Sequence, residues 1–392
     1  MVYKRTIYPS LIEHSQTPLV TVLTGMRRTG KTTLVKQLLS DLPNKNSLFF
    51  DLQRADNREL FSLKNYDAIV DALIARGLSD QQQMIVALDE IQFLPEITGV
   101  IKYLLDTHQI KFIVTGSSSY YLKNLFSESL AGRKKVFELY PLDFGEYLIF
   151  KEQTFRRTDW IATNFSVDEC NRFSAYYEEY VKFGGFPQVV LAQSPAEKQD
   201  LLSDILSSYI NIDIKTLADF ADERAYYNLA KLLARRVGSR VEYTKIASES
   251  GLSRHTVANY LTFLEKTYLI ATVPVYTHSV DREIVKSRKL YFIDTGLANT
   301  LADLSSGAQF ENSVFNQLAR KSMVQYFALK TGQEIDFVYD QKLALEVKET
   351  PIETDLSSLA RISATASIPS YRLIGRHHSP TFTNYIWAGS IV

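Results

Sequence analysis

The segment Gly25–Thr32 constrains this chain more than any other, because its sequence GMRRTGKT matches the pattern G-x-x-x-x-G-K-[ST]. An apolar run at 19–23 precedes it, and a helical pattern from Thr33 to Leu39 follows. Glycines let such a loop curl so that its backbone N–H groups face phosphate oxygens, and the next helix adds the positive end of its dipole. The sequence therefore predicts a strand, a phosphate-binding loop and a helix in this order.

The residues of this loop have distinct predicted roles. Lys31 is expected to reach the β- and γ-phosphates of a nucleotide, and the Thr32 hydroxyl is expected to hold Mg²⁺. ATP and Mg²⁺ are therefore the predicted cofactors. The residues expected to contact the nucleotide are Gly25, Met26, Arg27, Arg28, Thr29, Gly30, Lys31, Thr32 and Thr33.

A second apolar run, Met84–Glu90, ends in two adjacent carboxylates, as is typical of the metal-binding strand of P-loop proteins. Asp89 is expected to bind Mg²⁺ directly or through water. Glu90 is expected to orient and polarise the attacking water, a role that suits a carboxylate within hydrogen-bond reach. Together with the phosphate-binding loop, this pair predicts ATP hydrolysis.

Two further sets of residues are candidates for the same site. Ser117 and Ser118 follow a third apolar run, Lys111–Gly116, and their hydroxyls are predicted to sense the γ-phosphate or the attacking water. The alternative is an ordinary serine-rich turn. Arg133 is predicted to act as an arginine finger, on its own site or on that of a neighbouring subunit, and the alternative is a surface arginine.

Composition limits the class of protein and its compartment. A chain of 392 residues is expected to form two or three domains. Lys plus Arg and Asp plus Glu number 44 each, so binding to nucleic acid would need a local basic patch. Cys170 is the only cysteine, which excludes an intramolecular disulfide and favours a reducing compartment. Without a membrane-spanning stretch or a signal core, the chain is predicted to be cytoplasmic, with no membrane partner.

The pattern of apolar residues changes along the chain and predicts four domains. Strands alternate with helices at 1–145, as in a P-loop ATPase domain with a parallel sheet. Residues 146–236 read as long helices, broken at Gly184-Gly185-Phe186-Pro187, and are predicted to form a lid. The fold class is therefore α/β, completed by a winged helix-turn-helix at 237–300 and a C-terminal α/β nuclease-like domain at 301–392.

The winged helix-turn-helix is predicted from residues 244–257, where a short helix ends at Gly251 and Ser253 caps a second helix. Alternating segments at 271–276 and 289–293 would form the wing. DNA is one partner that such an element could contact, and the alternative is a protein-docking or lid module. The residues placed for DNA contact are Arg254, His255, Thr256, Arg282, Lys286, Arg288 and Lys289.

The C-terminal segment is expected to follow the order α-β-β-β-α-β, with a hairpin at 339–341. Asp336 precedes Glu346-x-Lys348 on strands that would pair, and Glu311 lies on the first helix. These three carboxylates are predicted to hold a divalent metal, while Lys348 positions or activates water for phosphodiester hydrolysis. Acid-rich hairpins are common, so a catalytically inactive domain of the same fold is the alternative.

Taken together, these segments resemble the prokaryotic predicted ATPases of the AAA+ superfamily that carry a C-terminal domain of unknown function. The resemblance implies an ATP-binding module, a winged helix and a PD-(D/E)xK nuclease-like end. The segments that carry it are Gly25–Thr32, Leu88–Glu90, Thr115–Ser118, Leu130–Arg133, Tyr140–Leu142, Gly184–Pro187, Tyr291–Leu297, Phe310–Asn312 and Glu346–Lys348.

Two functions agree with this sequence. The first is a Mg²⁺-dependent ATPase coupled to DNA binding or processing. The second is an ATP-dependent signalling switch, in which ATP changes self-association and an inactive nuclease-like domain docks a protein. Nuclease activity and the oligomeric state are left open by the sequence.

Overall fold

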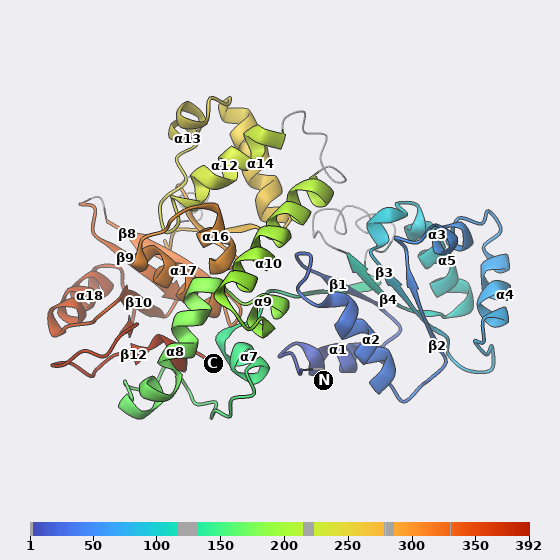
Figure 1. Cartoon of the computed structure of the whole chain (residues 1–392), viewed down its shortest axis with the longest axis horizontal. Coiled ribbons are helices and arrows are strands. Elements are labelled where there is room, and N and C mark those ends of the chain that lie inside the picture. Colours follow the sequence, from blue (N-terminus) through green and yellow to red (C-terminus); the bar gives the residue numbers. More distant parts are fainter. Residues whose placement is uncertain are drawn as a thin grey trace. The chain divides into compact units, whose positions relative to one another are not determined.

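A computed structural model describes residues 3–116, 130, 132–214, 223–277, 279, 286–329 and 331–392 (Figure 1). The predicted sensor serines Ser117 and Ser118 and the predicted wing residue Arg282 lie outside these ranges. The described chain divides into two compact units. The first unit contains residues 3–140 and Lys266–Tyr268, and the second contains 141–214, 223–265 and 269–392.

The first unit is built on a parallel five-stranded sheet of order β2-β3-β4-β1-β5, which confirms the predicted parallel sheet. Strand β4 lies between β1 and β3, so the strands that carry the phosphate-binding loop and the acidic pair are not direct neighbours. The strands are β1 Val20–Thr24, β2 Ser47–Asp51, β3 Ile85–Asp89, β4 Lys111–Gly116 and β5 Lys134–Glu138.

Helices cover both faces of this sheet because alternate strand residues point to opposite sides. Leu23 and Ile113 belong to the core that contains residues of α1 and α2, whereas Val22 and Val114 belong to the core that contains residues of α3, α4 and α5. The helices are α1 Tyr8–Ser15, α2 Lys31–Asp41, α3 Ala55–Phe61, α4 Asp67–Ala75, the short 3₁₀ helix η1 Ile91–Phe93 and α5 Ile97–His108.

Helices make up the first part of the second unit. Gly184 ends α8 with a φ of 74°, and a Cβ there would lie 2.1 Å from Asp294 Oδ1, so the predicted break has a steric cause. Ser194 caps α10, which continues directly into one turn of π-helix. The elements are α7 Phe144–Phe150, α8 Val167–Phe183, α9 Pro187–Leu191, α10 Pro195–Ser208, the π-helix η2 Tyr209–Ile214 and α12 Glu223–Ala234.

Three helices and a pair of antiparallel strands follow in the described part of the second unit. Gly251, with a φ of 70°, ends α13, and the Ser253 hydroxyl accepts a hydrogen bond of 3.0 Å from Thr256 N at the start of α14. Strands β6 and β7 pair antiparallel. The elements are α13 Tyr243–Ser250, α14 Arg254–Lys266, β6 Ile270–Val273, β7 Lys289–Phe292 and α16 Thr295–Leu301.

A second sheet, of order β12-β11-β10-β9-β8, forms the end of the chain. Asp340 and Gln341 adopt positive φ angles of 49° and 59° between β9 and β10, as a tight hairpin requires. Helix α18 packs on this sheet through Leu359 and Ile362. The elements are α17 Ser306–Leu318, β8 Val324–Ala328, β9 Glu334–Tyr339, β10 Leu343–Lys348, α18 Glu353–Thr365, β11 Ser370–Gly375, β12 Ile386–Trp387 and the 3₁₀ helix η3 Ala388–Ser390.

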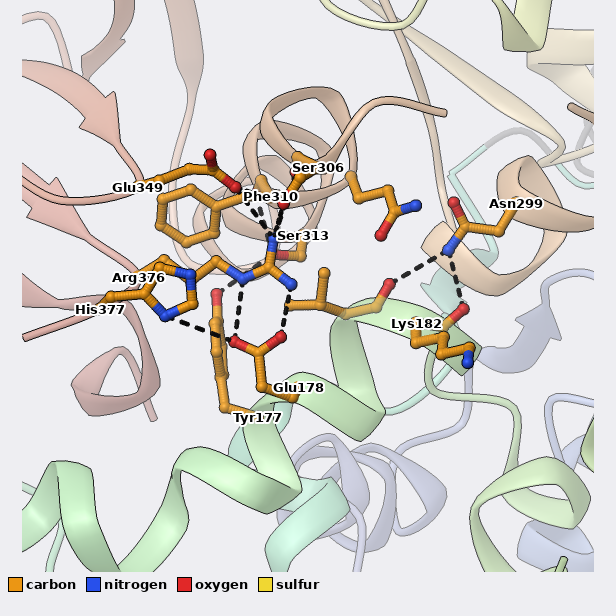
Figure 2. Close-up of polar contacts among 12 residues, drawn as sticks. Tyr177, Glu178, Lys182, Asn299, Ser306, Phe310, Ser313, Glu349, Arg376 and His377 are labelled. Carbon is orange, nitrogen blue, oxygen red and sulfur yellow. Dashed lines mark hydrogen bonds and ion pairs between the residues drawn. The ribbon is translucent and has the colours of Figure 1, made fainter. Parts of the chain in front are cut away.

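Arg376 joins the helical part of the second unit to this sheet (Figure 2). Its guanidinium donates to Glu178 Oε1 on α8 at 2.9 Å and to Ser306 Oγ on α17 at 2.8 Å. Glu349, just after β10, lies 3.4 Å away. Because the Arg376 side chain is only 8% exposed, these contacts fix α8, α17 and the end of β11 relative to one another.

No helix in the described ranges combines the length and the apolar character that crossing a bilayer requires.

Candidate nucleotide site and acidic cluster

The phosphate-binding loop adopts a backbone that depends on its glycines. Gly25 has a φ of 152°, and a Cβ there would lie 2.1 Å from the carbonyl oxygen of Leu139. Gly30 has a φ of 97° and forms the N-cap of α2, where it offers no side chain to the first N–H groups of the helix. These N–H groups therefore face the loop, as an anion site requires.

The side chain of Lys31 lies inside the loop and contacts the loop backbone. Its side chain is buried, and Nζ donates to the carbonyl oxygens of Gly25 at 2.9 Å and Met26 at 3.0 Å. The Thr29 hydroxyl donates to the same Met26 oxygen at 2.9 Å. The ammonium thus lies within the curl of the loop, where its charge can pair with phosphate oxygens.

Arg5 supports the loop from the residues before α1, and no local sequence pattern marked it as a site residue. Its guanidinium donates to the carbonyl oxygens of Thr29 at 3.0 Å and Tyr140 at 2.7 Å. Arg5 is 8% exposed. One buried cation therefore ties the loop to the residues that follow β5.

The metal-binding and water-activating candidates meet at the carboxyl edge of the sheet. The Thr32 hydroxyl donates to Asp89 Oδ2 at 2.7 Å. The Thr115 hydroxyl, at the end of β4, donates to Asp89 Oδ1 and accepts from Glu90 N at 3.1 Å. Burial raises the pKa of Asp89, although both hydroxyls oppose this change. Hydroxyl and carboxylate oxygens in this arrangement suit Mg²⁺.

Thr115 was not among the predicted site residues. The predicted hydroxyls were those of Ser117 and Ser118, which lie outside the described residues. The parallel register places Thr115 opposite Leu23, one residue before the end of β1.

The Glu90 carboxylate lies against the phosphate-binding loop. The residue has a φ of 56°, is 8% exposed, and accepts a hydrogen bond from Gln92 Nε2. Arg27 Nη2 of the loop lies 3.9 Å from Glu90 Oε2. Positive φ at a glutamate is uncommon, so contacts on both its backbone and its side chain hold Glu90 in place.

Arg133 lies at the opposite edge of the sheet. Its carbonyl oxygen accepts a hydrogen bond of 2.8 Å from Val20 N, at the first residue of β1. The length of β1, roughly 17 Å, separates this point from the phosphate-binding loop. Its guanidinium pairs with Asp106 of α5 at 2.9 Å, and both side chains are about two-fifths exposed. This position is remote from the loop of the same chain, so a finger role would have to serve a neighbouring subunit.

The C-terminal acidic residues form a separate cluster in the second unit. Asp336 on β9 accepts from Val347 N of β10 at 2.9 Å, so the hairpin register brings it beside Glu346 as expected. Lys348 Nζ lies 2.9 Å from Glu346 Oε1, on the same face of β10. Glu311 of α17 accepts from the Tyr291 hydroxyl at 2.6 Å.

Lys289, the first residue of β7, also belongs to this cluster. Its Nζ lies 2.9 Å from Glu334 Oε1 and 3.7 Å from both Glu311 Oε1 and Asp336 Oδ1. Burial and the neighbouring Asp336 raise the pKa values of Glu311 and Glu346 to about 7. Within the described part of the chain, no three Asp, Glu, His or Cys side chains are arranged to hold a metal ion.

The residues predicted for DNA contact have different environments. Arg254 and His255 are exposed at the start of α14, and Thr256 is half-buried. Lys286 and Arg288 are exposed before β7. Lys289 is 1% exposed and faces carboxylates, so it does not belong to this surface.

Comparisons with known proteins assign the first part of the chain. Residues 17–148 match a family model described as an AAA domain. Because this match contains the phosphate-binding loop and the acidic pair, residues 17–148 are an ATP-binding domain of the AAA P-loop ATPase type. Residues 174–308 match a domain of unknown function, DUF8612, so the acidic residues from Glu311 onward lie beyond both models.

Two similar proteins have names that assign no function. The chain is 26% identical to an uncharacterized protein of Haemophilus influenzae, covering 91% of this chain and 90% of that protein. It is also 26% identical to uncharacterized protein MJ1544 of Methanocaldococcus jannaschii, covering 81% and 71%. A solved signal transduction ATPase with a tetratricopeptide repeat sensor from Pyrococcus horikoshii is 15% identical, with a TM-score of 0.32, covering 82% of this chain and 46% of that one.

Proposed function

We propose that this protein is a Mg²⁺-dependent ATPase whose nucleotide cycle acts on the second unit of the chain. The observation that carries the proposal is the hydrogen-bonded group of Thr32, Asp89, Thr115 and Glu90 at the mouth of the phosphate-binding loop. Thr32 and Asp89 would hold Mg²⁺, which supplies positive charge to the phosphates when bound. Of the other two residues, Glu90 would act on water, and Thr115 would position Asp89 and Glu90.

Lys31 would change partners when ATP binds. Its ammonium donates to two loop carbonyls that lie where the loop curls, and phosphate oxygens are stronger acceptors than neutral carbonyls. Lys31 would therefore pair with the β- and γ-phosphates. The backbone N–H groups at the start of α2 would complete the phosphate site.

Glu90 would act on the attacking water. Gln92 holds its carboxylate, and Arg27 of the loop lies nearby. Bound phosphates would attract the Arg27 guanidinium away from Glu90. The Glu90 carboxylate would then be able to accept a proton from water. Thr115 would keep the Glu90 backbone beside Asp89 during this step.

Steady-state ATP hydrolysis with Mg²⁺ tests this mechanism. We expect Lys31→Ala to lose nucleotide binding, and Glu90→Gln to bind ATP but hydrolyse it poorly. Lys36→Ala, an exposed lysine of the same helix, is the matched control and should behave as the unsubstituted protein. Unchanged turnover in Glu90→Gln would remove this residue from the mechanism.

The second unit would couple the cycle to a partner. We take α13, α14 and the β6–β7 hairpin as a winged helix, and α17 to β11 as a nuclease-like fold, on the basis of the element order and of Asp336 beside Glu346 and Lys348. DNA binding through the exposed Arg254, His255 and Lys286 would favour a role in DNA processing.

A protein-docking switch is the second candidate function. One observation favours it, because Lys289 fills the cluster that a nuclease would need for metal. ATP hydrolysis measured with and without linear or branched DNA separates the two functions. Stimulation by DNA supports DNA processing, whereas indifference supports protein docking and a search for partners.

A further inference from the structure

Lys289 is a buried cation of the second unit that is shared by three carboxylates. Its side chain is 2% exposed. It belongs to β7 of the hairpin, whereas the three carboxylates around it belong to α17 and β9. Burial alone would lower the pKa of Lys289, but the carboxylates outweigh it and raise the pKa, so the side chain remains a cation.

The surroundings of Lys289 hold the carboxylates in this arrangement. A Cβ on Gly238 would lie 2.9 Å from Glu311 Oε2, so the chain before the hairpin closely covers this carboxylate. Arg240 Nη2 lies 3.2 Å from the second oxygen of Glu334. Lys289 Nζ also lies 5.7 Å from the centre of the Tyr326 ring. Arg240 and Lys289 therefore bring positive charge to the cluster from segments that precede the C-terminal sheet, in addition to Lys348 on β10.

An ammonium and a divalent metal would compete for the same oxygens. Mg²⁺ binds carboxylate oxygens at about 2.1 Å and requires them to converge on one point. Here Lys289 Nζ lies at hydrogen-bond distance from Glu334 Oε1, 2.9 Å, and forms longer ion pairs of 3.7 Å with Glu311 and Asp336, so the ammonium already occupies the space between these oxygens. Repulsion between a bound metal and an ammonium at this distance would disfavour having both.

We propose that Lys289 is a tethered cation that occupies the carboxylate cluster in place of a divalent metal, so that the cluster binds no divalent metal while this ammonium is present. The same contacts attach the β6–β7 hairpin to the C-terminal sheet. The inference concerns the second unit alone and does not depend on ATP hydrolysis.

Binding of Mn²⁺, followed by its electron paramagnetic resonance signal, tests this inference. The full chain would carry Lys31→Ala and be measured without nucleotide, so that the phosphate-binding loop does not contribute. We expect no Asp336-dependent binding up to about 1 mM Mn²⁺ in this parent. Lys289→Met should bind Mn²⁺ at least about tenfold more tightly, and adding Asp336→Asn should abolish the gain.

Two controls separate the loss of this cation from general effects. Lys289→Arg keeps the charge and should not gain Mn²⁺ binding. Lys342→Met removes an exposed lysine in the turn between β9 and β10, with a side chain 77% exposed, and should also gain none. Fluorescence of Trp160 and Trp387, both buried in the second unit, reports whether each variant is folded.

Two results would overturn the inference. One is a folded Lys289→Met protein that gains no Mn²⁺ binding. The other is binding tighter than about 1 mM in the parent that disappears with Asp336→Asn. The second comparison needs no change at Lys289, so it decides the question even if Lys289→Met does not fold. A failure of ATP hydrolysis would appear in neither measurement.

Discussion

Replacing Thr115 by valine tests whether the acidic pair works as a hydrogen-bonded group. The two side chains have nearly the same shape, so the buried end of β4 keeps its packing. The substitution removes the hydroxyl that donates to Asp89 and accepts from Glu90 N at 3.1 Å. It leaves the phosphate-binding loop unchanged, so ATP affinity should change little.

The size of the effect follows from the two lost hydrogen bonds. Each is worth about 1 kcal/mol, and leaving the buried N–H of Glu90 without a partner adds to this cost, for a total of about 2–3 kcal/mol. If the full cost falls on the transition state, kcat decreases roughly 30- to 150-fold. A decrease of at least about tenfold is therefore expected, because part of the cost also falls on the ground state.

The assay combines steady-state ATP hydrolysis with binding of a fluorescent ATP analogue. Thr115→Ser keeps the hydroxyl and should retain most of the activity. Thr21→Val removes a buried hydroxyl from neighbouring β1, where it contacts His14 Nδ1 at 2.8 Å, and should leave kcat unchanged. A Thr115→Val protein that binds and hydrolyses ATP like the unsubstituted protein would refute the proposed role of this hydroxyl.

Two predictions concern the stability of the second unit, followed by tryptophan fluorescence during denaturation. Arg376→Met should lower the free energy of unfolding by about 2 kcal/mol, because Glu178, Glu349 and Ser306 lose the buried guanidinium, while Glu178 stays partly hydrated and limits the cost; an unchanged midpoint would contradict this. Burial raises the pKa of Asp294 from 3.8 to about 6, so its stabilising protonated form is lost as the pH rises through this window. Relative to Asp294→Asn, the free energy of unfolding of the native protein should therefore decrease by up to about 3 kcal/mol between pH 4 and pH 7. Parallel pH profiles of the two proteins would show that Asp294 is not responsible.

Local patterns predicted most of the first unit correctly. The loop glycines, the apolar strands and the acidic pair are each encoded within a few residues, because backbone conformation and strand burial depend on short segments. The parallel register then brings Asp89 to the edge where Thr32 begins α2.

Residues that act through distant contacts could not be predicted in the same way. Arg5 reaches Tyr140, 135 residues further along the chain, and no periodic pattern marks such a contact. Lys289 was predicted to be a wing residue because it follows the basic residues Lys286 and Arg288 in the sequence. Its side chain faces the carboxylates because of the alternation of side chains along β7 and because α17 packs on that side. The second of these depends on residues far away in the sequence.

The contacts of Arg5 show that the ATP-binding domain needs residues before the start of the family match. The family match begins at residue 17, yet the carbonyl of Thr29 inside the phosphate-binding loop is held by a guanidinium twelve positions ahead of that start. A fragment trimmed to the matched residues would lack both this guanidinium and helix α1, which packs on α2. Recombinant fragments intended to bind ATP should therefore keep the chain from before Arg5, and fusion partners at the amino terminus need a linker long enough to leave this residue buried.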